Sequence, residues 1–540
     1  MAKRNFHNEF TYMHFLEANK EYEFDAAFSK AIEKVYGNLG KEYPLIIGGQ
    51  EVKSEAQLEE HSPIDGRLIG RFQKGNRDQA IMAIDAAKKA FDSWREINYK
   101  QRASIIRTFS NLLARDKFEL AAMLSIENGK SRYESIGEVD EAIDFARYYA
   151  NEIEANRGYV RYVSLPESKA KVMLSFQGAP SNAEKVKIIL KPYGVFGVIA
   201  PFNFPISIST GMSIGAIITG NTVVFKPSST DNMSMLTGYQ IYLHLKEAGL
   251  PDGVFNYLTG PGSEVGAELA LNANVSGIVF TGSRSTGMGM LANTYAEHKQ
   301  KVFIVEMGGK NPAIVTETAN LDSAANGIVG AAFGFAGQKC SALSRVYIQD
   351  SIKEELISKI VERLRSMKIG NPLEKDVYLG PLISESAYKR YMETIEKIKA
   401  TGKILYGGHR ISSNLNGFYV DPVLAELSHD NEIVHKELFL PILAIIPYKS
   451  FDDAIKMAND TEYGLTAGLY TGSSKDIKKF ENEIEAGVIY INRSISATTG
   501  AIVGLHTFVG WKGSGFTGKG TGSKYYLQQF MREQSISISK

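Results

Sequence analysis

The sequence predicts an α/β fold in which parallel sheets are covered by helices. From residue 194 onward, short apolar runs alternate with turns and longer helical patterns; these runs are "VFGVIA", "NTVVFK", "VFNYLT" and "GIVFT". Parallel strands joined by crossover helices produce such an alternation. A second alternating series begins near "KVFIVEM" and continues to about residue 495. We therefore expect two sheets, each formed by its own part of the chain.

Helical elements are expected before the first of these strands. Residues 1 to about 45 are mixed and charged, which favours a helical extension packed on the main body, and helical patterning continues to about residue 157. One apolar stripe has the three- and four-residue spacing of an amphipathic helix: Ile81, Ile84, Ala87, Phe91 and Trp94. "KVMLSFQ" and "KVKIIL" then predict a hairpin around the turn-rich "GAPSNAE". In the second series, "SRVYIQD" predicts a strand and "SIKEELISKIVERLRSM" an amphipathic helix.

Composition and charge exclude several classes of function. The chain has 540 residues, of which 61 are basic and 60 acidic, so a net charge of +1 gives no footprint for nucleic acid or an anionic membrane. A small molecule is the expected partner. The single cysteine excludes an internal disulfide and, with an N-terminus that lacks an apolar signal core, favours a cytoplasmic location. The apolar run "LFLPILAIIPY" is too short to span a bilayer and contains two prolines.

Two glycine-rich patterns near the C-terminus imitate nucleotide-binding motifs. Residues 513 to 518 read "GSGFTG", but a dinucleotide-binding loop must lie inside a βαβ unit, and only 22 residues follow Gly518. The longer "GSGFTGKG" has Gly520 where a phosphate loop needs a Ser or Thr to bind magnesium. A turn-rich connection is the better interpretation, and no metal site is predicted.

The only thiol of the chain, Cys340, lies in the small-residue segment "AAFGFAGQKCSALSRVYI". A lone cysteine is most often a small buried hydrophobe, and a thiol reacts as a nucleophile only in its thiolate form. The nine histidines are scattered and none is close in sequence, so there is no local signature of a Cys/His protease. Other segments must therefore indicate whether this thiol is structural or reactive.

Three further segments carry groups that suit chemistry on a carbonyl. Glu306 ends the buried strand of "VFIVEMGGKNPAIV", where a carboxylate is costly unless it is functional or paired. Asn203 follows the strand of "GVIAPFNFPISI" with an amide able to donate to an oxyanion. In "FTGSRSTGMG", Gly282 and Ser283 lead from a strand into a helix and leave N–H groups for an anion. Taken singly, Asn203 can equally be a helix cap, Glu306 an ion-pair partner and Gly282 part of a simple turn.

Together these segments resemble the aldehyde dehydrogenase superfamily over essentially the whole chain from about residue 45. The motifs are "APFNFP", "VVFKPSS", "FTGSRSTG", "EMGGKNP", "GQKCSALSR", "HKELFLPI" and "GWKGSG", and Cys340 lies 34 residues after Glu306 and 97 before Glu437. The resemblance implies an α/β fold with two parallel-sheet, Rossmann-like domains and a small β oligomerisation element. The implied parts are a dinucleotide-binding domain (1–160 and 192–307), a catalytic domain (308–495) and oligomerisation elements (161–191 and 496–540).

The resemblance also implies a mechanism. Cys340 would attack an aldehyde carbon, while the Asn203 side chain and the Cys340 N–H would hold the oxyanion. Hydride would pass to a nicotinamide, and Glu306 would activate the water that releases the acid from a thioester.

NAD is the implied cofactor. NADP is expected to be tolerated, because Ser229 stands three residues after Lys226, where strongly NAD-selective members often carry a glutamate that repels the 2′-phosphate. The cofactor-binding residues implied by the resemblance are Ile199, Ala200, Pro201, Phe202, Lys226, Ser229, Gly262, Gly266, Gly282, Ser283, Glu437 and Phe439.

Within the superfamily, "FGFAGQKCSALSR", "YPLIIGGQEV" and "TTGAIVG" look most like the 1-pyrroline-5-carboxylate dehydrogenase branch, which oxidises glutamate γ-semialdehyde to glutamate in proline degradation. The substrate-binding residues implied by this branch are Phe204, Ser341, Gly500, Ala501 and Phe508. Thr507 and Val509 replace a usual proline and glycine, and Leu440 replaces the glycine of "IFGP", so the substrate is less determined than the reaction class.

Several alternatives to this substrate and reaction stay open. Another carboxylate-bearing semialdehyde, such as succinate semialdehyde, would suit a related enzyme. A cofactor-free cysteine acyl hydrolase and a non-catalytic binding protein are the alternatives from other classes. The resemblance further implies a homo-oligomer, either a dimer or a higher even assembly.

Overall fold

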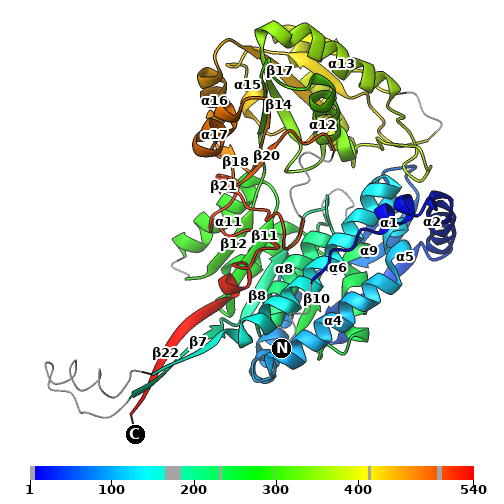
Figure 1. The fold of residues 1–540 in the computed structure, drawn as a ribbon. Helices are drawn as coiled ribbons and strands as arrows, with labels where there is room; N and C mark the ends of the chain where they lie inside the picture. The colour runs from blue at the N-terminus through cyan, green and yellow to red at the C-terminus, as the bar shows by residue number, and fades with distance from the viewer. Residues whose placement is uncertain are drawn as a thin grey trace, which may run out of the picture.

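The structure is a computed structural model, and it describes residues 6–164, 184–229, 234–297, 300–411, 415–495 and 502–539. Figure 1 shows two lobes, each built around a sheet, and a narrow ribbon of strands that projects away from them. The N-terminal half of the chain forms the lower lobe in this view, and the upper lobe holds the helices from α12 to α17.

Helices dominate the first 155 residues, as the sequence predicted: α1 (Thr11–Glu17), α2 (Glu21–Tyr36), α3 (Arg77–Trp94), α4 (Tyr99–Arg115), α5 (Lys117–Asn128) and α6 (Arg132–Ala155). α3 begins with a capping box, in which the Asn76 side chain accepts from the N–H of Gln79 and the Gln79 side chain accepts from the N–H of Asn76. The predicted apolar stripe of α3 is buried or half-buried along its length. Between α2 and α3 lies a small sheet of order β1-β5-β4, formed by β1 (Lys41–Tyr43), β4 (Gln57–His61) and β5 (Leu68–Gln73).

The first large sheet has the order β12-β11-β8-β9-β10-β2-β3, and its strands from β12 to β10 are parallel. The strands are β2 (Leu45–Ile47), β3 (Gln50–Val52), β8 (Val195–Ile199), β9 (Thr222–Lys226), β10 (Phe255–Tyr257), β11 (Val275–Thr281) and β12 (Val302–Glu306). The connecting helices are α8 (Ser207–Ile218), α9 (Met235–Glu247), α10 (Ala267–Leu271) and α11 (Arg284–Ala296). The predicted parallel sheet is thus confirmed, but β12, from "KVFIVEM", does not start the second series. Its hydrogen bonds go to β11, so it is the edge strand of this first sheet.

The second large sheet has the order β15-β16-β17-β14-β13-β19-β20 and is parallel except at the β15 edge. Its strands are β13 (Asn311–Val315), β14 (Leu343–Gln349), β15 (Lys403–Tyr406), β16 (Val423–Glu426), β17 (Ile442–Tyr448), β19 (Thr466–Tyr470) and β20 (Val488–Ile491). The helices are α12 (Leu321–Phe333), α13 (Lys353–Ser366), α14 (Glu385–Thr401), α15 (Glu432–His435), α16 (Phe451–Asn459) and α17 (Ser474–Glu483). Residues 307–310 pass directly from β12 of the first sheet to β13 of the second.

The projecting ribbon consists of β6 (Val160–Ser164), β7 (Glu184–Pro192) and β22 (Met531–Ser539), in the antiparallel order β22-β7-β6. Figure 1 shows β7 and β22 leaving the lower lobe side by side. The predicted strand "KVKIIL" lies within β7, whereas "KVMLSFQ" and most of the turn "GAPSNAE" lie outside the described residues. Residues 339 positions apart in the chain therefore meet in one sheet, because Met531 of β22 pairs with Pro192 of β7.

The glycine pattern at residues 513–518 follows the short strand β21 (Trp511–Lys512), which pairs with β18 (Tyr463–Gly464). Turns and bends follow it as far as the 3₁₀ turn η5 (Leu527–Phe530). A dinucleotide-binding loop would open a helix at this point, so the prediction of a turn-rich connection is confirmed. Within the described part of the chain, no helix is long and apolar enough to cross a membrane.

Candidate active site

Cys340 lies in a tight loop between α12 and β14. The loop contains three successive left-handed residues, Phe335, Ala336 and Gly337, with φ of 49°, 53° and 67°. A left-handed φ is unfavourable for residues that carry a side chain, and it persists where the surroundings enforce it. At Gly337 a Cβ would lie 2.4 Å from the carbonyl oxygen of Leu440. The Cys340 thiol that follows this strained turn is free and half-buried.

Glu306 is the last residue of β12, and its side chain lies under the C-terminal segment of the chain. Its backbone forms a bridge with Gly515, and the N–H of Met307 donates to the carbonyl of Ser514 at 2.8 Å. The carboxylate atom Oε2 is buried and has no hydrogen-bond partner among the described residues. Burial raises the pKa of Glu306 well above its usual value, while a hydrogen bond from the Gly510 backbone lowers it in part.

Glu437 rests on the paired glycines that follow β12. Its Oε1 accepts a hydrogen bond from the N–H of Gly309 at 2.9 Å, and a Cβ on Gly308 would lie 2.1 Å from its Oε2. Any side chain at Gly308 would therefore displace this carboxylate. Burial raises the pKa of Glu437 to about 7, although the Gly309 N–H and the charge of Lys310 act in the opposite direction.

Cys340, Glu306, Glu437 and Asn203 meet where the two lobes join. Burial raises the pKa of Cys340 to about 12, and the charges of Glu437 and Glu306 add to this effect. The backbone N–H groups of Ser341 and Cys340 lower the pKa of the same thiol. Asn203 is buried, and its Nδ2 donates to the carbonyl of Gln338, two residues before the cysteine, at 3.2 Å. An amide donor thus contacts the turn that carries the thiol, and two carboxylates lie near enough to raise the pKa of the thiol, which is a set of groups suited to acyl transfer.

The residues predicted for one side of a cofactor lie at the carboxyl ends of β8 and β9. Residues 199–202 lead out of β8, and the Phe202 ring lies 5.8 Å from the ring of Phe439. Lys226, the last residue of β9, is 4% exposed, and its Nζ donates to the carbonyl of Pro227 at 3.2 Å and to Ser229 Oγ at 3.3 Å. Burial lowers the pKa of Lys226 to about 8.

The remaining predicted cofactor residues lie at the carboxyl ends of β10 and β11. Gly262 and Gly266 bound the π-helical turn η2 (Gly262–Gly266), and a Cβ on either would have no neighbour within 4 Å. Ser283 caps α11 by accepting from the N–H of Thr286. The sequence predicts a free N–H at Gly282. In the structure, however, this N–H donates to the carbonyl of Glu306 at 3.2 Å. Because Ser283 takes the Thr286 N–H, the N–H groups of the first turn of α11 that are left for an anion are those of Arg284 and Ser285.

The predicted substrate residues are only partly placed. Phe204 and Phe508 are half-buried and Ser341 is buried, whereas Gly500 and Ala501 lie outside the described residues. Of the departures from the family pattern, Leu440 and Val509 are buried and Thr507 is half-buried.

A buried ion pair that the sequence does not predict lies beside Phe204. Lys130 and Glu138 are fully buried and paired, and the Lys130 ammonium lies 3.7 Å from the centroid of the Phe204 ring. Glu138 also accepts from the N–H of Ile206 at 2.9 Å, so the pair braces the loop that carries Asn203. Glu138 and Ile206 lie 68 residues apart in the chain. No local sequence pattern distinguishes Lys130, just before α6, or Glu138, on α6, from ordinary surface charges.

A model of the aldehyde dehydrogenase family matches residues 51–536 of the chain. The protein belongs to the aldehyde dehydrogenase family. This aldehyde dehydrogenase is 38% identical over 529 residues, 97% of both chains, to 1-pyrroline-5-carboxylate dehydrogenase 1 of Halalkalibacterium halodurans. It is 36% identical over 518 residues to 1-pyrroline-5-carboxylate dehydrogenase 2 of Bacillus subtilis, which covers 95% of this chain and 96% of the relative. A solved structure of 1-pyrroline-5-carboxylate dehydrogenase from Thermus with bound NAD matches with a TM-score of 0.91 at 33% identity, covering 100% of each chain.

The fold class predicted for this aldehyde dehydrogenase is thereby confirmed. The N-terminal helices α1 and α2 precede the part of the chain that the family model matches, yet they pack on its core, α1 through Tyr12 and Phe15 and α2 through Phe24 and Phe28. The family model includes both large sheets from β3 onward and ends within β22 of the ribbon.

Proposed function

We propose that this aldehyde dehydrogenase oxidises L-glutamate γ-semialdehyde, derived from 1-pyrroline-5-carboxylate, to L-glutamate with NAD as cofactor, in proline degradation. The observation that carries the reaction class is the convergence of Cys340, Asn203 and Glu306 between the two sheets. The names of relatives at 38% and 36% identity support the substrate, and the Thermus structure supports the cofactor.

The residues present fit a nicotinamide dinucleotide. Lys226 is a buried ammonium whose hydrogen bonds go to a carbonyl and a hydroxyl, so it has donor capacity left for ribose hydroxyls. The first turn of α11 would hold the pyrophosphate, and Glu437 would hold the nicotinamide ribose. Ser229 leaves room for NADP as well, because it adds no negative charge near the 2′ position. A bound oxidised nicotinamide would supply a hydride acceptor and a positive charge beside the sulfur.

The chain's own residues would divide the chemistry as follows. The Cys340 sulfur, after losing its proton to solvent, would form a bond to the aldehyde carbon as the carbonyl π bond opens, and the second N–H of the Asn203 amide and the Cys340 N–H would donate to the oxyanion. A donor in this role is commonly worth about 3 kcal/mol. After hydride loss leaves a thioester, Glu306 takes a proton from water, the water oxygen attacks the thioester carbon, and the carbon–sulfur bond breaks to release the acid. A raised pKa makes the ionised form of Glu306 a stronger base for this step.

We also propose the remaining features of the assignment. The dinucleotide-binding domain would comprise 1–160 and 192–307, the catalytic domain 308–495, and the oligomerisation elements 161–191 and 496–540. A cytoplasmic homo-oligomer is the expected state. Exposed apolar side chains on the ribbon, Tyr162 and Ile538, support a contact between subunits there.

A panel of aldehydes assayed with NAD and with NADP tests the proposal. Glutamate γ-semialdehyde with NAD should give the highest kcat/KM among glutamate γ-semialdehyde, succinate semialdehyde and propanal. A higher kcat/KM for succinate semialdehyde would overturn the substrate assignment while leaving the reaction class. Release of acid from a thioester or ester with no cofactor requirement, and no reduction of NAD with any aldehyde, would favour the cysteine hydrolase instead.

A further inference from the structure

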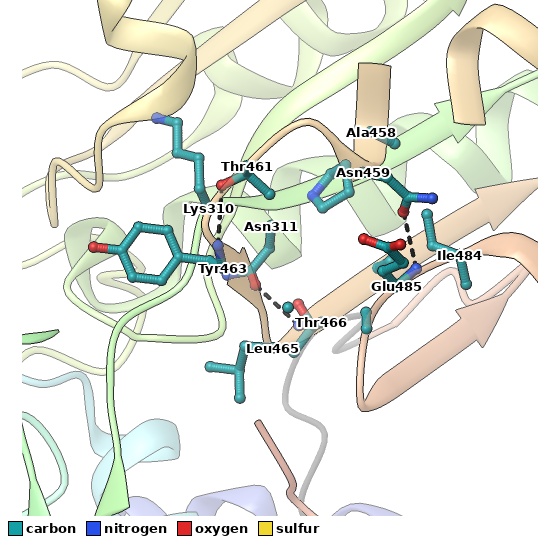
Figure 2. A pocket seen from close by; sticks show the side chains of 14 residues that line it. Lys310, Asn311, Ala458, Asn459, Thr461, Tyr463, Leu465, Thr466, Ile484 and Glu485 are labelled. Carbon is teal, nitrogen blue, oxygen red and sulfur yellow. Dashed lines mark hydrogen bonds between the residues drawn. The ribbon is translucent and has the colours of Figure 1, made fainter. Parts of the chain in front are cut away.

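Asn311, the first residue of β13, grips the turn that carries Cys340. It is 2% exposed, and its Nδ2 donates to the carbonyl of Cys340 at 2.7 Å and to the carbonyl of Ala342 at 2.9 Å. Its Oδ1 accepts from the N–H of Thr466 at 3.0 Å, a contact drawn in Figure 2. The amide is therefore anchored to β19 on one side and holds the backbone on both sides of Ser341 on the other.

The Cys340 carbonyl that Asn311 holds belongs to the same peptide unit as the Ser341 N–H. A trans peptide is planar, so its carbonyl and its N–H point in opposite directions. Fixing the carbonyl toward Asn311 consequently fixes the N–H on the opposite side, and the Ser341 N–H is one of the two backbone groups that lower the pKa of the Cys340 thiol.

Gly309 makes this arrangement possible. A Cβ at Gly309 would lie 2.4 Å from the Cys340 carbonyl oxygen, 2.7 Å from Asn311 Oδ1 and 2.9 Å from Asn311 Nδ2. No side chain fits between the amide and the turn. The connection of residues 307–310 thus brings Asn311 into contact with the cysteine turn, and its Gly309 N–H binds Glu437.

We propose that Asn311 is a positioning residue for the nucleophile: by holding the carbonyls of Cys340 and Ala342, it fixes the peptide between Cys340 and Ser341 and so the place of the Ser341 N–H relative to the sulfur. The role deepens the proposed function, since it assumes that Cys340 reacts. Asn311 itself touches neither aldehyde nor cofactor in this scheme. Its effect on catalysis passes through the peptide between Cys340 and Ser341.

Alkylation by iodoacetamide tests the proposal without substrate or cofactor. Cys340 is the only cysteine, so the gain of mass of the intact protein reports on this thiol alone. In Asn311→Ala the pH midpoint of alkylation should move upward, and the rate at a fixed pH below that midpoint should fall about tenfold for each pKa unit of the change. In turnover assays kcat should fall about 10- to 100-fold, the usual effect of a misplaced reacting group, with KM within about threefold of wild type.

Asn256 provides a matched control. It is also buried, its Nδ2 donates to the carbonyls of Val223 at 3.2 Å and Gly253 at 2.8 Å, and its Oδ1 accepts from the N–H of Gly48 at 2.8 Å. Asn256→Ala also removes three side-chain hydrogen bonds to the backbone, two donated and one accepted, but it removes them from β10 of the first sheet. It should lose comparable thermal stability but keep the alkylation profile of wild type.

A folded Asn311→Ala protein with the wild-type alkylation profile would overturn the proposal. If Asn311→Ala does not fold, Asn311→Ser, which keeps one donor, should show the same upward move to a smaller extent, and an unchanged profile in that variant would overturn the proposal equally. Failure of the proposed function is a separate outcome. A protein that shows the expected alkylation shift but reduces no NAD with any aldehyde would retain the positioning role and lose the dehydrogenase assignment.

Discussion

Cys340 lies between groups that oppose its ionisation and groups that favour it. Burial and the carboxylates of Glu437 and Glu306 raise its pKa, and the N–H groups of Cys340 and Ser341 act against them. The opposing effects are larger, so the pKa of the thiol is raised to about 12. Because the thiolate is the reactive form of a cysteine, a positive charge brought beside the sulfur would favour its reaction.

At the residue scale, Glu437 should make folding stability depend on pH. Its pKa is raised from 4.5 to about 7, so the folded state binds this proton more tightly than the unfolded state. The stabilisation is complete below the unfolded pKa and is lost as the pH rises through about 7. Glutamine cannot ionise. As the pH rises from acidic to alkaline, the free energy of unfolding of Glu437→Gln should therefore increase by up to about 3 kcal/mol relative to that of wild type.

Denaturant unfolding at pH 5 and at pH 8 measures most of this difference, because the first value lies close to the unfolded pKa of 4.5 and the second lies above the folded pKa of about 7. Glu393→Gln, a change of an exposed glutamate on α14, serves as the control and should show no such trend. A stability gain of Glu437→Gln that is larger at the lower pH would contradict the assigned direction.

At the element scale, the left-handed turn before Cys340 determines where the thiol lies. Gly337→Ala places a Cβ 2.4 Å from the Leu440 carbonyl and forces a side-chain residue to φ of 67°. The left-handed conformation alone costs roughly 1–2 kcal/mol, and the contact adds to it. We expect a lower melting temperature and a kcat reduced about 100-fold, because the turn must shift the reacting sulfur.

A second glycine gives the comparison for this substitution. Gly137 lies on the exposed side of α6, and a Cβ there would meet nothing within 4 Å. Gly137→Ala should stabilise the protein by about 1 kcal/mol through helix propensity and leave kcat unchanged. Equal thermal and kinetic effects of the two substitutions would show that the turn geometry does not matter.

The sequence predicted local elements better than their partners. The apolar runs located β8, β9, β10 and β11, because a buried parallel strand is apolar on both faces. The strand β12 has the same composition, and nothing in its five residues specifies that it pairs with β11 rather than with β13. The strand β6 was missed because "VRYVS" is short and largely exposed, and its partner β7 begins twenty residues later.

At the site, too, the sequence predicts residues that stand in local motifs but not roles that depend on contacts with distant parts of the chain. Cys340, Glu306 and Asn203 were proposed from motifs, and the structure brings them together. Asn311 was invisible as a positioning residue, although it stands in the quoted motif "EMGGKNP", because its partners lie 29, 31 and 155 residues away. The small pocket in Figure 2 is lined by residues 310–312 and by residues between 458 and 486. Parts of the chain that are far apart in sequence therefore meet around Asn311.

At the scale of the whole molecule, the ribbon of β6, β7 and β22 projects beyond both lobes and carries exposed apolar side chains. Tyr162 is 74% exposed and Ile538 is 54% exposed, which a solvent-facing sheet seldom tolerates. We expect Ile538→Asp to lower the mass of the assembly measured by light scattering after gel filtration, because a charge would be buried against the second subunit. Ser537→Asp on the same strand is the comparison for charge alone. A wild-type protein that elutes as a monomer would contradict the oligomeric role.

The proposed mechanism requires a covalent acyl intermediate on Cys340 and requires Glu306 to activate the water that resolves this intermediate. Mass spectrometry of Glu306→Gln after mixing with glutamate γ-semialdehyde and NAD tests it most directly. We expect an acyl adduct on the peptide that contains Cys340, together with one equivalent of reduced cofactor and little further turnover. Steady release of glutamate at the wild-type rate by Glu306→Gln, with Cys340 unmodified, would contradict it.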